Sequence, residues 1–262
     1  MNIKFSPLFS GSSGNAVFIR AGDVSLLIDA GCNGSAIIDA VNSIGENPRE
    51  LKGILITHEH SDHIKGAGIV SRMLDIPIYA NEETWLAMED KIGKVAEKNI
   101  CIANEAFYLK NIEILPFNTP HDSAKPQGYR ICFNGKSVAV ATDLGHFSKP
   151  VLTALKNTDL VLLEANHDID MLKSSSYPYV LKQRILGKKG HLSNSGAAQA
   201  CLELVNSNIR GIILGHLSRE NNSEQLAYST VLEHLSEHGV AVGQDLALSI
   251  AFRNKLSGNY FV

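Results

Sequence analysis

The sequence has no long hydrophobic run and no sign of a targeting segment. No stretch approaches the roughly 18 apolar residues of a membrane-spanning helix. The opening residues, MNIKFSPLFSGSSGN, lack the basic stretch and the apolar run that make up a secretory signal peptide. We therefore expect no membrane segment and a cytoplasmic location.

Cysteine is scarce and the net charge is small. The four cysteines, Cys32, Cys101, Cys132 and Cys201, lie far apart and form no CxxC or CxC pair, which favours buried reduced thiols. The net charge is -3 over 262 residues, so the chain lacks the overall basic field of a protein that coats nucleic acid. An enzyme that contacts a few phosphates at one site remains compatible with this charge.

The order of apolar runs predicts a β-rich half followed by a half in which strands and helices alternate. Strands are predicted over residues 3–9, 16–20, 24–28, 53–57, 76–80, 107–110, 112–117, 129–133, 138–142, 160–164, 209–214 and 246–252. Helices are predicted over residues 35–44, 64–74, 82–90, 149–156, 178–186, 195–206 and 223–237. Residues 91–104 give no clear pattern. Since no linker separates the halves, we expect one domain over residues 1–262, an α/β fold forming a four-layered αββα sandwich.

A cluster of metal-binding residue types directly follows the predicted strand 53–57. It contains His58, His60, Asp62 and His63 in the spacing HxHxDH. Imidazoles suit zinc, manganese or iron, and a carboxylate suits the harder of these ions. The spacing of His58 and His60 on an extended segment directs both rings to one side, and the last two residues can serve a second ion. A solvated polar turn is the alternative, and it explains the composition poorly.

Four further segments each end an apolar run with a polar residue that fits the same site. They carry Asp29 in Leu-Ile-Asp-Ala-Gly, His121 in Asn-Thr-Pro-His-Asp, Asp143 in Ala-Thr-Asp-Leu-Gly and His216 in Leu-Gly-His-Leu-Ser. Each alone fits a capped turn or a satisfied histidine equally well. Together with HxHxDH, in this order, they predict a single metal site.

This order of motifs resembles the five motifs of the metallo-β-lactamase superfamily. The resemblance implies two divalent ions per chain, held by His58, His60 and His121, by Asp62, His63 and His216, and by a bridging Asp143. It also implies that Asp29 braces the histidine loop without ligating. Asp62 is expected both to ligate and to accept the proton of the attacking water. The carboxylate of Asp143 argues against the antibiotic-hydrolysing branch, which carries a thiolate at that position.

Other segments narrow the resemblance. The short stretch between Asp143 and His216 leaves no room for the inserted domain of the RNase J type, and the chain lacks the long arm of the RNase Z type. Leu-Glu-Ala-Asn-His-Asp at 163–168, Gly-His-Leu-Ser-Asn at 190–194 and Ser-Gly-Ser-Ser-Gly-Asn at 10–15 resemble the YycJ/WalJ branch. That resemblance implies a bacterial exonuclease that acts on DNA from 5′ ends and is linked to mismatch correction and chromosome maintenance.

His191 and the basic residues just before it are predicted to act on the substrate. His191 lies outside the five motifs and is expected to contact the scissile phosphate or protonate the leaving oxygen, with a structural histidine as the alternative. The basic residues just before it are expected to contact phosphates; they are Lys182, Arg184, Lys188 and Lys189. The alternative is a solvated helix end whose cations favour the helix dipole.

Weaker signals complete the predicted site. His167 and Asp168 follow the predicted strand 160–164 and are expected near a substrate phosphate. The loop Ser10–Asn15 either offers backbone N–H groups to a phosphate or is a simple hairpin.

The sequence therefore predicts a two-metal phosphodiester hydrolase, with DNA as the expected partner and RNA as a second possibility. The alternatives are a phosphodiesterase on small substrates, a thioesterase of the glyoxalase II type, or a non-catalytic protein that keeps the fold. An open cationic groove would favour the nuclease, and a closed pocket would favour the small-molecule enzyme.

Overall fold

Two seven-stranded sheets form the centre of the protein in the computed structural model, which describes residues 2–262. The first sheet has the order β14 (Tyr260–Phe261), β1 (Ile3–Phe9), β2 (Ala16–Ala21), β3 (Val24–Ile28), β4 (Leu51–Leu55), β5 (Ile78–Ala80) and β6 (Ile100–Ile102). The second has the order β13 (Ala247–Ile250), β12 (Gly211–Gly215), β11 (Leu160–Glu164), β10 (Lys136–Ala141), β9 (Gln127–Phe133), β8 (Ile112–Asn118) and β7 (Phe107–Leu109).

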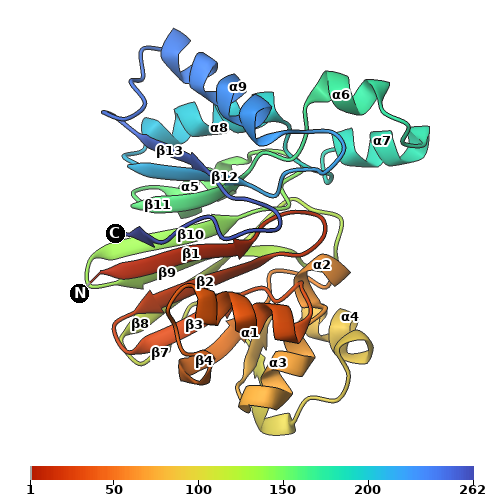
Figure 1. The fold of residues 1–262 in the computed structure, drawn as a ribbon, viewed down its shortest axis with the longest axis vertical. Coiled ribbons are helices and arrows are strands. Elements are labelled where there is room, and N and C mark those ends of the chain that lie inside the picture. Colours follow the sequence, from red (N-terminus) through yellow and green to blue (C-terminus); the bar gives the residue numbers. More distant parts are fainter. Residues whose placement is uncertain (1) are drawn as a thin grey trace.

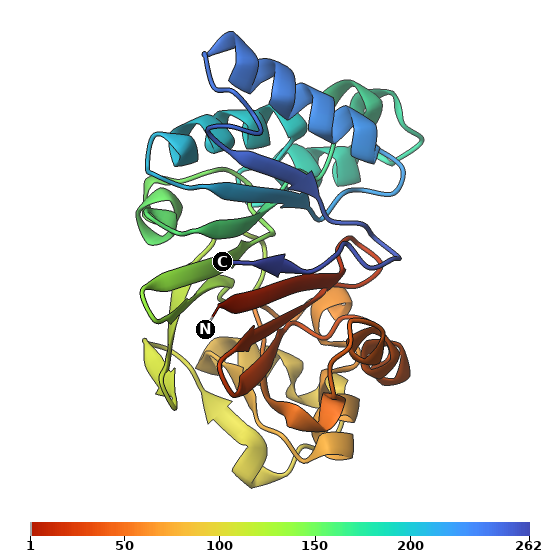
Figure 2. The same cartoon turned by 60° about the vertical axis from the view of Figure 1, so that its left-hand side comes forward.

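Helices cover the outer face of each sheet. The first sheet is covered by α1 (Gly34–Ser43), α3 (Ala67–Leu74) and α4 (Glu82–Ile92). The second is covered by α5 (Lys149–Leu155), α8 (Asn194–Val205) and α9 (Glu224–Glu237). Figure 1 and Figure 2 show the resulting layers, and the C-terminal end lies at mid-height on the left-hand side of Figure 1, beside β1. The predicted four-layered αββα sandwich is confirmed.

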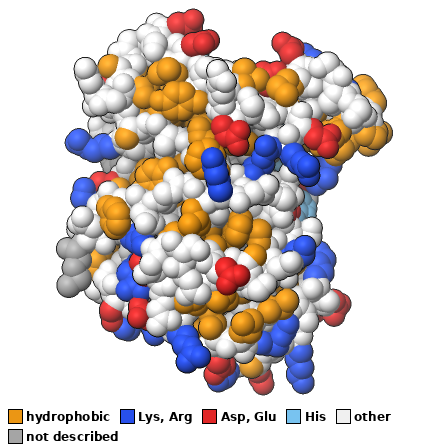
Figure 3. Space-filling model, viewed as in Figure 1, with side chains coloured by type: hydrophobic (Ala, Val, Ile, Leu, Met, Phe, Trp, Pro, Cys, Tyr) orange, Lys and Arg blue, Asp and Glu red, His pale blue; other side chains and the backbone are white. Residues whose placement is uncertain are grey.

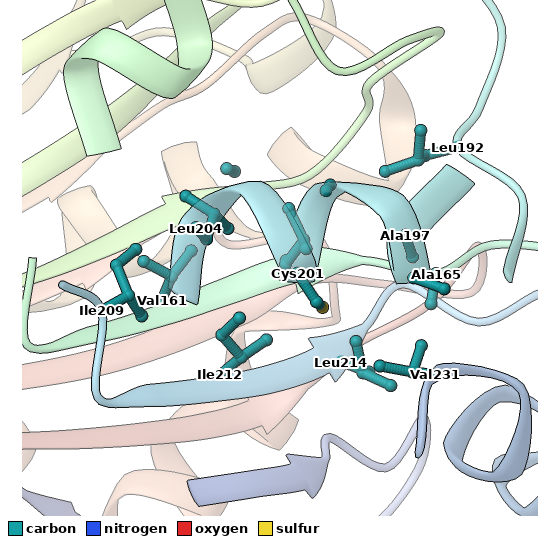
Figure 4. Close-up of a cluster of buried hydrophobic side chains, with 14 of the residues drawn as sticks. Val161, Ala165, Leu192, Ala197, Cys201, Leu204, Ile209, Ile212, Leu214 and Val231 are labelled. Atoms are coloured by element: carbon teal, nitrogen blue, oxygen red, sulfur yellow. The ribbon is translucent and has the colours of Figure 1, made fainter. Parts of the chain in front are cut away.

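Three buried clusters correspond to the three interfaces between the layers. On β10, Val138 and Val140 join the cluster between the sheets, whereas Ala139 and Ala141 join the outer cluster under the helices. Successive side chains of a strand point to opposite faces of the sheet, and on β10 both faces are buried. Figure 4 shows the outer cluster of the second sheet, where Cys201 of α8 lies above the strands.

The cysteines are all free, but they are not equally buried. Burial raises the pKa of the Cys201 thiol, as expected for an inert core residue. Cys32, Cys101 and Cys132 are only half-buried. The prediction of buried thiols is therefore correct in full only for Cys201.

Two short helices, α6 (Ile169–Ser174) and α7 (Tyr179–Leu186), project from the body at the edge of the second sheet (Figure 1). Opposite them, α2 (Ser61–Ile64) is a single turn inside the histidine motif, so the predicted helix 64–74 is divided into α2 and α3. Neither α6 nor β14 was predicted, because each is too short to show a period. Within residues 2–262, no helix combines the length and the hydropathy that crossing a membrane requires.

Candidate metal centre

Most of the predicted site residues follow the carboxyl ends of strands that run parallel to a neighbour, and His121 follows the antiparallel strand β8. Asp29 directly follows β3, the histidine motif follows β4, and Asp143 and His216 come immediately after β10 and β12. Carboxyl ends of parallel strands meet at one edge of a sheet, which is where open α/β folds bind ligands. The two sheets bring these strand ends to the same edge of the sandwich, the right-hand edge in Figure 1, and Figure 3 shows histidine at that edge.

The backbone at these strand ends turns sharply. Asp29, Asp143 and His216 have φ values of 61°, 58° and 57°, in the left-handed region that residues other than glycine rarely adopt. Such conformations persist where the surrounding structure fixes them, and they gather at functional sites. Gly31 allows a close approach nearby, since a Cβ there would lie 1.6 Å from the carbonyl oxygen of Asp62.

Three imidazoles converge in the first ligand set. His58 Nε2 lies 3.1 Å from His60 Nδ1, which lies 3.3 Å from His121 Nε2. The other nitrogens of two of these rings are engaged: His58 Nδ1 donates to Thr57 Oγ1 at 3.0 Å, and His121 Nδ1 donates to the carbonyl of Gly190 at 3.0 Å. His58 Nε2 and His121 Nε2 therefore carry lone pairs that point toward His60 Nδ1, an arrangement that a cation stabilises.

A second set lies beside the first. His63 Nε2 and His216 Nε2 lie 3.6 and 3.7 Å from Asp62 Oδ2. Their outer nitrogens are held by carboxylates, His63 Nδ1 by Asp29 Oδ2 at 2.8 Å and His216 Nδ1 by Glu164 Oε1 at 2.9 Å. Asp29 also accepts from the backbone N–H of Thr57 at 2.8 Å, so it fixes the start of the histidine loop.

Asp143 lies between the two sets. Its Oδ2 is 3.3 Å from His63 Nε2, and its Oδ1 is 3.6 Å from His121 Nε2 and 3.7 Å from His216 Nε2. Within residues 2–262, Asp143 Oδ2 and His216 Nε2 are buried without a hydrogen-bond partner. Burying such groups unpaired is expensive. These His and Asp donors, with their unpaired atoms, fit divalent metal ions.

The electrostatics of the cluster are dominated by burial and by opposed charges. Burial lowers the pKa of His63, but Asp143 and Asp29 outweigh it and raise the pKa to about 9. Burial and the neighbouring imidazoles hold the pKa of His58 well below its usual value. Burial opposes ionisation of Asp62, yet His63 and His216 lower its pKa on balance. The carboxylates are thus ionised and matched by positive charge on the neighbouring imidazoles.

Glu164 is the functional residue that the sequence did not reveal. It is fully buried, and its Oε1 accepts from His191 Nδ1 at 2.7 Å as well as from His216 Nδ1. Its Oε2 accepts from the backbone N–H groups of Leu144 and Leu192. Burial raises the pKa of Glu164, but the facing His191 and His216 lower it below its ordinary value. The available signal was a carboxylate at the end of an otherwise apolar strand.

A cavity of about 390 Å³ opens beside these groups. Among its lining residues are Asp62, Asp143, His191 and His216 from the centre, Ser12 and Ser218 from neighbouring loops, and Tyr177, Leu181, Arg184 and Ile185 from α7 and the segment before it. Arg184 is the one lysine or arginine in the lining that the described residues provide. The cavity is therefore not the strongly cationic groove that the sequence led us to expect of a nuclease.

The four basic residues before His191 have different surroundings. Arg184 donates to Asp122 from Nε at 2.5 Å and from Nη2 at 3.2 Å. Lys182 Nζ donates to the carbonyls of Lys173 and Ser175, at the end of α6. Lys188 and Lys189 are exposed, and their side chains make no hydrogen bond or ion pair with any part of the chain that the structure describes. The phosphate contacts stay a prediction, with only these last two side chains free to make them.

His167 and Asp168 do not line the cavity. Asp168 is the N-cap of α6, where its Oδ1 accepts from the backbone N–H groups of Asp170 and Met171. His167 is buried with neither ring nitrogen paired inside residues 2–262, and burial lowers its pKa to about 4. The geometry gives no support to the prediction that these two residues contact the substrate.

The loop Ser10–Asn15 supports the ligands. Ser10 Oγ accepts from the backbone N–H of His216 at 2.8 Å, and the Asn15 amide lies 3.0 Å from His63 Nε2. Ser12 is its one residue in the cavity lining.

Comparisons with known proteins agree with this geometry. A family model described as a β-lactamase superfamily domain matches residues 25–216. The chain is 41% identical over 249 residues to the exodeoxyribonuclease WalJ of Streptococcus pneumoniae serotype 2, covering 94% of this chain and 93% of that protein. It is 39% identical over 246 residues to the exodeoxyribonuclease YycJ of Bacillus anthracis, covering 93% of each. The metallo-β-lactamase fold protein YhfI of Bacillus subtilis has the same fold, with a TM-score of 0.73 over all of both chains at 14% identity.

Proposed function

The chain belongs to the β-lactamase superfamily and to its WalJ/YycJ branch, and from this premise we propose that it is a metal-dependent exodeoxyribonuclease. The observation that carries the proposal is the 41% identity to an exodeoxyribonuclease across 94% of the chain. The match also covers 93% of that relative, so the proposal rests on nearly the whole length of both proteins.

Two divalent ions fit the donors of the centre. His58, His60 and His121 would hold the first, Asp62, His63 and His216 the second, and Asp143 would bridge them. This set of imidazoles and carboxylates without a thiolate accepts zinc, manganese or iron. Two such ions supply Lewis acidity at the phosphoryl group and activate water near neutral pH.

His191 and Asp62 move the protons in this proposal. Glu164 accepts the Nδ1–H of His191, which leaves Nε2 as the ring nitrogen available to the cavity. With both ring nitrogens protonated, His191 donates its Nε2 proton to the oxygen that leaves, and the neutral ring that remains keeps its Nδ1–H on Glu164, which is the behaviour of a positioned general acid. Asp62 lines the same cavity and accepts the proton of the attacking water.

The finer assignments rest on the resemblance to the branch. We propose that digestion starts at 5′ ends of DNA and serves mismatch correction or chromosome maintenance. With the chromosome as substrate, the expected location is the cytoplasm.

The test is an assay of substrate class. Protein reconstituted with zinc, manganese or iron is incubated with 5′-phosphorylated and 5′-hydroxyl DNA duplexes, single strands and RNA of the same sequence, and the products are sequenced. We expect mononucleotides released from 5′ ends of DNA, and no release by an Asp143→Ala variant. Hydrolysis of bis-p-nitrophenyl phosphate or of a glutathione thioester without any DNA degradation would refute the proposal and favour a small-molecule enzyme.

A further inference from the structure

The helix α7 has an apolar face that does not belong to the core. None of its eight residues is buried, although it contains Leu181, Ile185 and other apolar side chains. Leu181 and Ile185 are four residues apart on α7 and so share one face of the helix, and Tyr177 lies just before the helix N-cap, Pro178. We call these three residues the Tyr177–Leu181–Ile185 stripe. All three line the cavity beside the metal centre, and all three are half-buried.

The cavity therefore has two chemically different walls. One wall carries the charged groups Asp62, Asp143 and His191, and the other carries the Tyr177–Leu181–Ile185 stripe. Its volume of about 390 Å³ falls in the range of pockets for single small ligands, roughly 300–1,000 Å³. A phosphodiester alone has no apolar part to occupy the second wall, whereas a nucleobase has a flat face that stacks on aromatic and aliphatic side chains.

The backbone around the centre holds this wall in place. Arg184 of α7 pairs with Asp122, the residue after His121, and the backbone N–H of His191 donates to the carbonyl of Ile185 at 2.9 Å. The loop that leaves α7 is close-packed, since a Cβ at Gly190 would lie 2.2 Å from the carbonyl oxygens of Arg184 and Ile185. The apolar stripe thus lies at a fixed position relative to two residues of the centre.

We propose, building on the proposed nuclease function, that the Tyr177–Leu181–Ile185 stripe binds one nucleobase next to the scissile phosphate, with the Tyr177 ring stacked on it. A base in this pocket has left the duplex stack. The preferred substrate is therefore a strand whose terminal nucleotides are unpaired, as in a single strand or a frayed or mismatched end. Since every base has a stackable face, the subsite tolerates all four bases.

The scarcity of cations in the cavity lining supports this subsite. The single arginine of the described lining is already paired with Asp122, so cationic side chains contribute little to substrate binding beside the metal ions. Stacking of a base on the stripe contributes binding affinity that does not depend on charge.

The experiment uses 5′-phosphorylated single strands in which one abasic residue replaces the first, second or third nucleotide. Binding is measured by fluorescence anisotropy with metal-loaded protein on strands made with hydrolysis-resistant phosphorothioate linkages, and cleavage is measured with the same protein on ordinary strands. For wild type, we expect one of the three abasic positions to weaken binding about 5- to 150-fold, the equivalent of about 1–3 kcal/mol. In Tyr177→Ala the ratio of the dissociation constants for the abasic and the intact strand should fall to about one, and Tyr177→Phe should retain the wild-type ratio.

Tyr179→Ala is the matched control. Tyr179 lies near the same helix start but is 74% exposed and outside the cavity lining, so this variant should keep the wild-type penalty. Circular dichroism and thermal melting check that each variant is folded. The subsite is refuted if no abasic position matters to wild type, or if Tyr177→Ala keeps the full penalty. An abasic penalty in binding without any DNA cleavage would refute the nuclease function and leave the base-binding subsite standing.

Discussion

Glu164 has an unusual position among the acidic residues of the protein, because one buried carboxylate serves two histidines with different proposed roles. It holds His216 of the second ligand set and His191 of the cavity wall through the same oxygen, at 2.9 and 2.7 Å. A buried carboxylate is stable only with such partners, and it fixes both rings with Nδ1 protonated. The metal-site histidine and the proposed general acid therefore depend on the same acceptor for their Nδ1–H groups.

Replacing His191 should separate chemistry from metal binding. His191→Ala removes a side chain that is not part of the two proposed ligand sets, so the metal content should stay at the wild-type level. DNA hydrolysis should fall about 10²–10⁴-fold, the usual contribution of a general acid or base. Metal analysis and single-turnover rates check this pair of outcomes. Loss of metal in His191→Ala would make His191 a ligand, as its place in a cluster with Asp143, Glu164 and His216 permits.

Glu164→Gln should reduce both metal binding and DNA hydrolysis. Both rings donate to Glu164 Oε1, and the backbone N–H groups of Leu144 and Leu192 donate to Oε2. The NH2 group of glutamine must therefore face either the two rings or the two backbone N–H groups, and that pair of donors loses its acceptor. Metal affinity should fall about 10–100-fold, the usual effect of losing such a support, and activity should fall further than in His191→Ala. Metal titration and the pH profile of kcat are the measurements. If Glu164→Gln has the wild-type affinity and pH profile, then Glu164 only fills space.

At the scale of elements, most of the fold followed from hydrophobic periodicity. Strand 160–164 was predicted with its bounds, and the main helices were predicted to within a few residues. The elements without a period were missed. In α6 a single residue, Leu172, is buried, and β14 has two residues. The histidine motif was expected to precede a helix, but α2 begins within it, because side chains chosen for metal chemistry hide the helical pattern.

Because α6 was not predicted, the sequence analysis also missed a structural role for Lys182. Its ammonium group donates to the carbonyls of Lys173 and Ser175, and a cation in this place stabilises the end of a helix. Since no helix was predicted over α6, there was no helix end to which Lys182 could be assigned. Contacts with phosphates are therefore expected from Lys188 and Lys189.

This division of the basic run is testable by salt dependence. In the double variant Lys188→Gln/Lys189→Gln, the slope of log binding constant against log salt for duplex DNA should decrease by about 0.9 for each lost phosphate contact. Lys182→Gln is the control on the same run and should keep the wild-type slope, because its ammonium group is already engaged. Equal slopes for all three proteins would mean that the run is a solvated helix end.

At the scale of the whole molecule, the metal centre joins the two halves of the sandwich. His58, His60, Asp62 and His63 follow a strand of the first sheet, whereas His121, Asp143 and His216 follow strands of the second. The sequence predicted this set of residues because each lies at the end of an apolar run. It could not predict Asn15, Glu164 or the α7 wall, because their roles depend on which segments meet in space.

Metal removal should therefore destabilise the whole sandwich. Ions that bind the folded chain and not the unfolded chain stabilise it by about 4 kcal/mol at a thousandfold excess over the dissociation constant. For a chain of this size, that corresponds to roughly 10 °C in melting temperature.

Metal analysis of the untreated protein should give two equivalents of metal per chain. The Asp143→Ala variant should contain fewer equivalents and should melt at a lower temperature. His234→Ala, on α9, is a control distant from the proposed ligand sets and should keep both equivalents. One equivalent that survives Asp143→Ala, or a melting temperature that EDTA leaves unchanged, would contradict a bridged two-metal centre between the sheets.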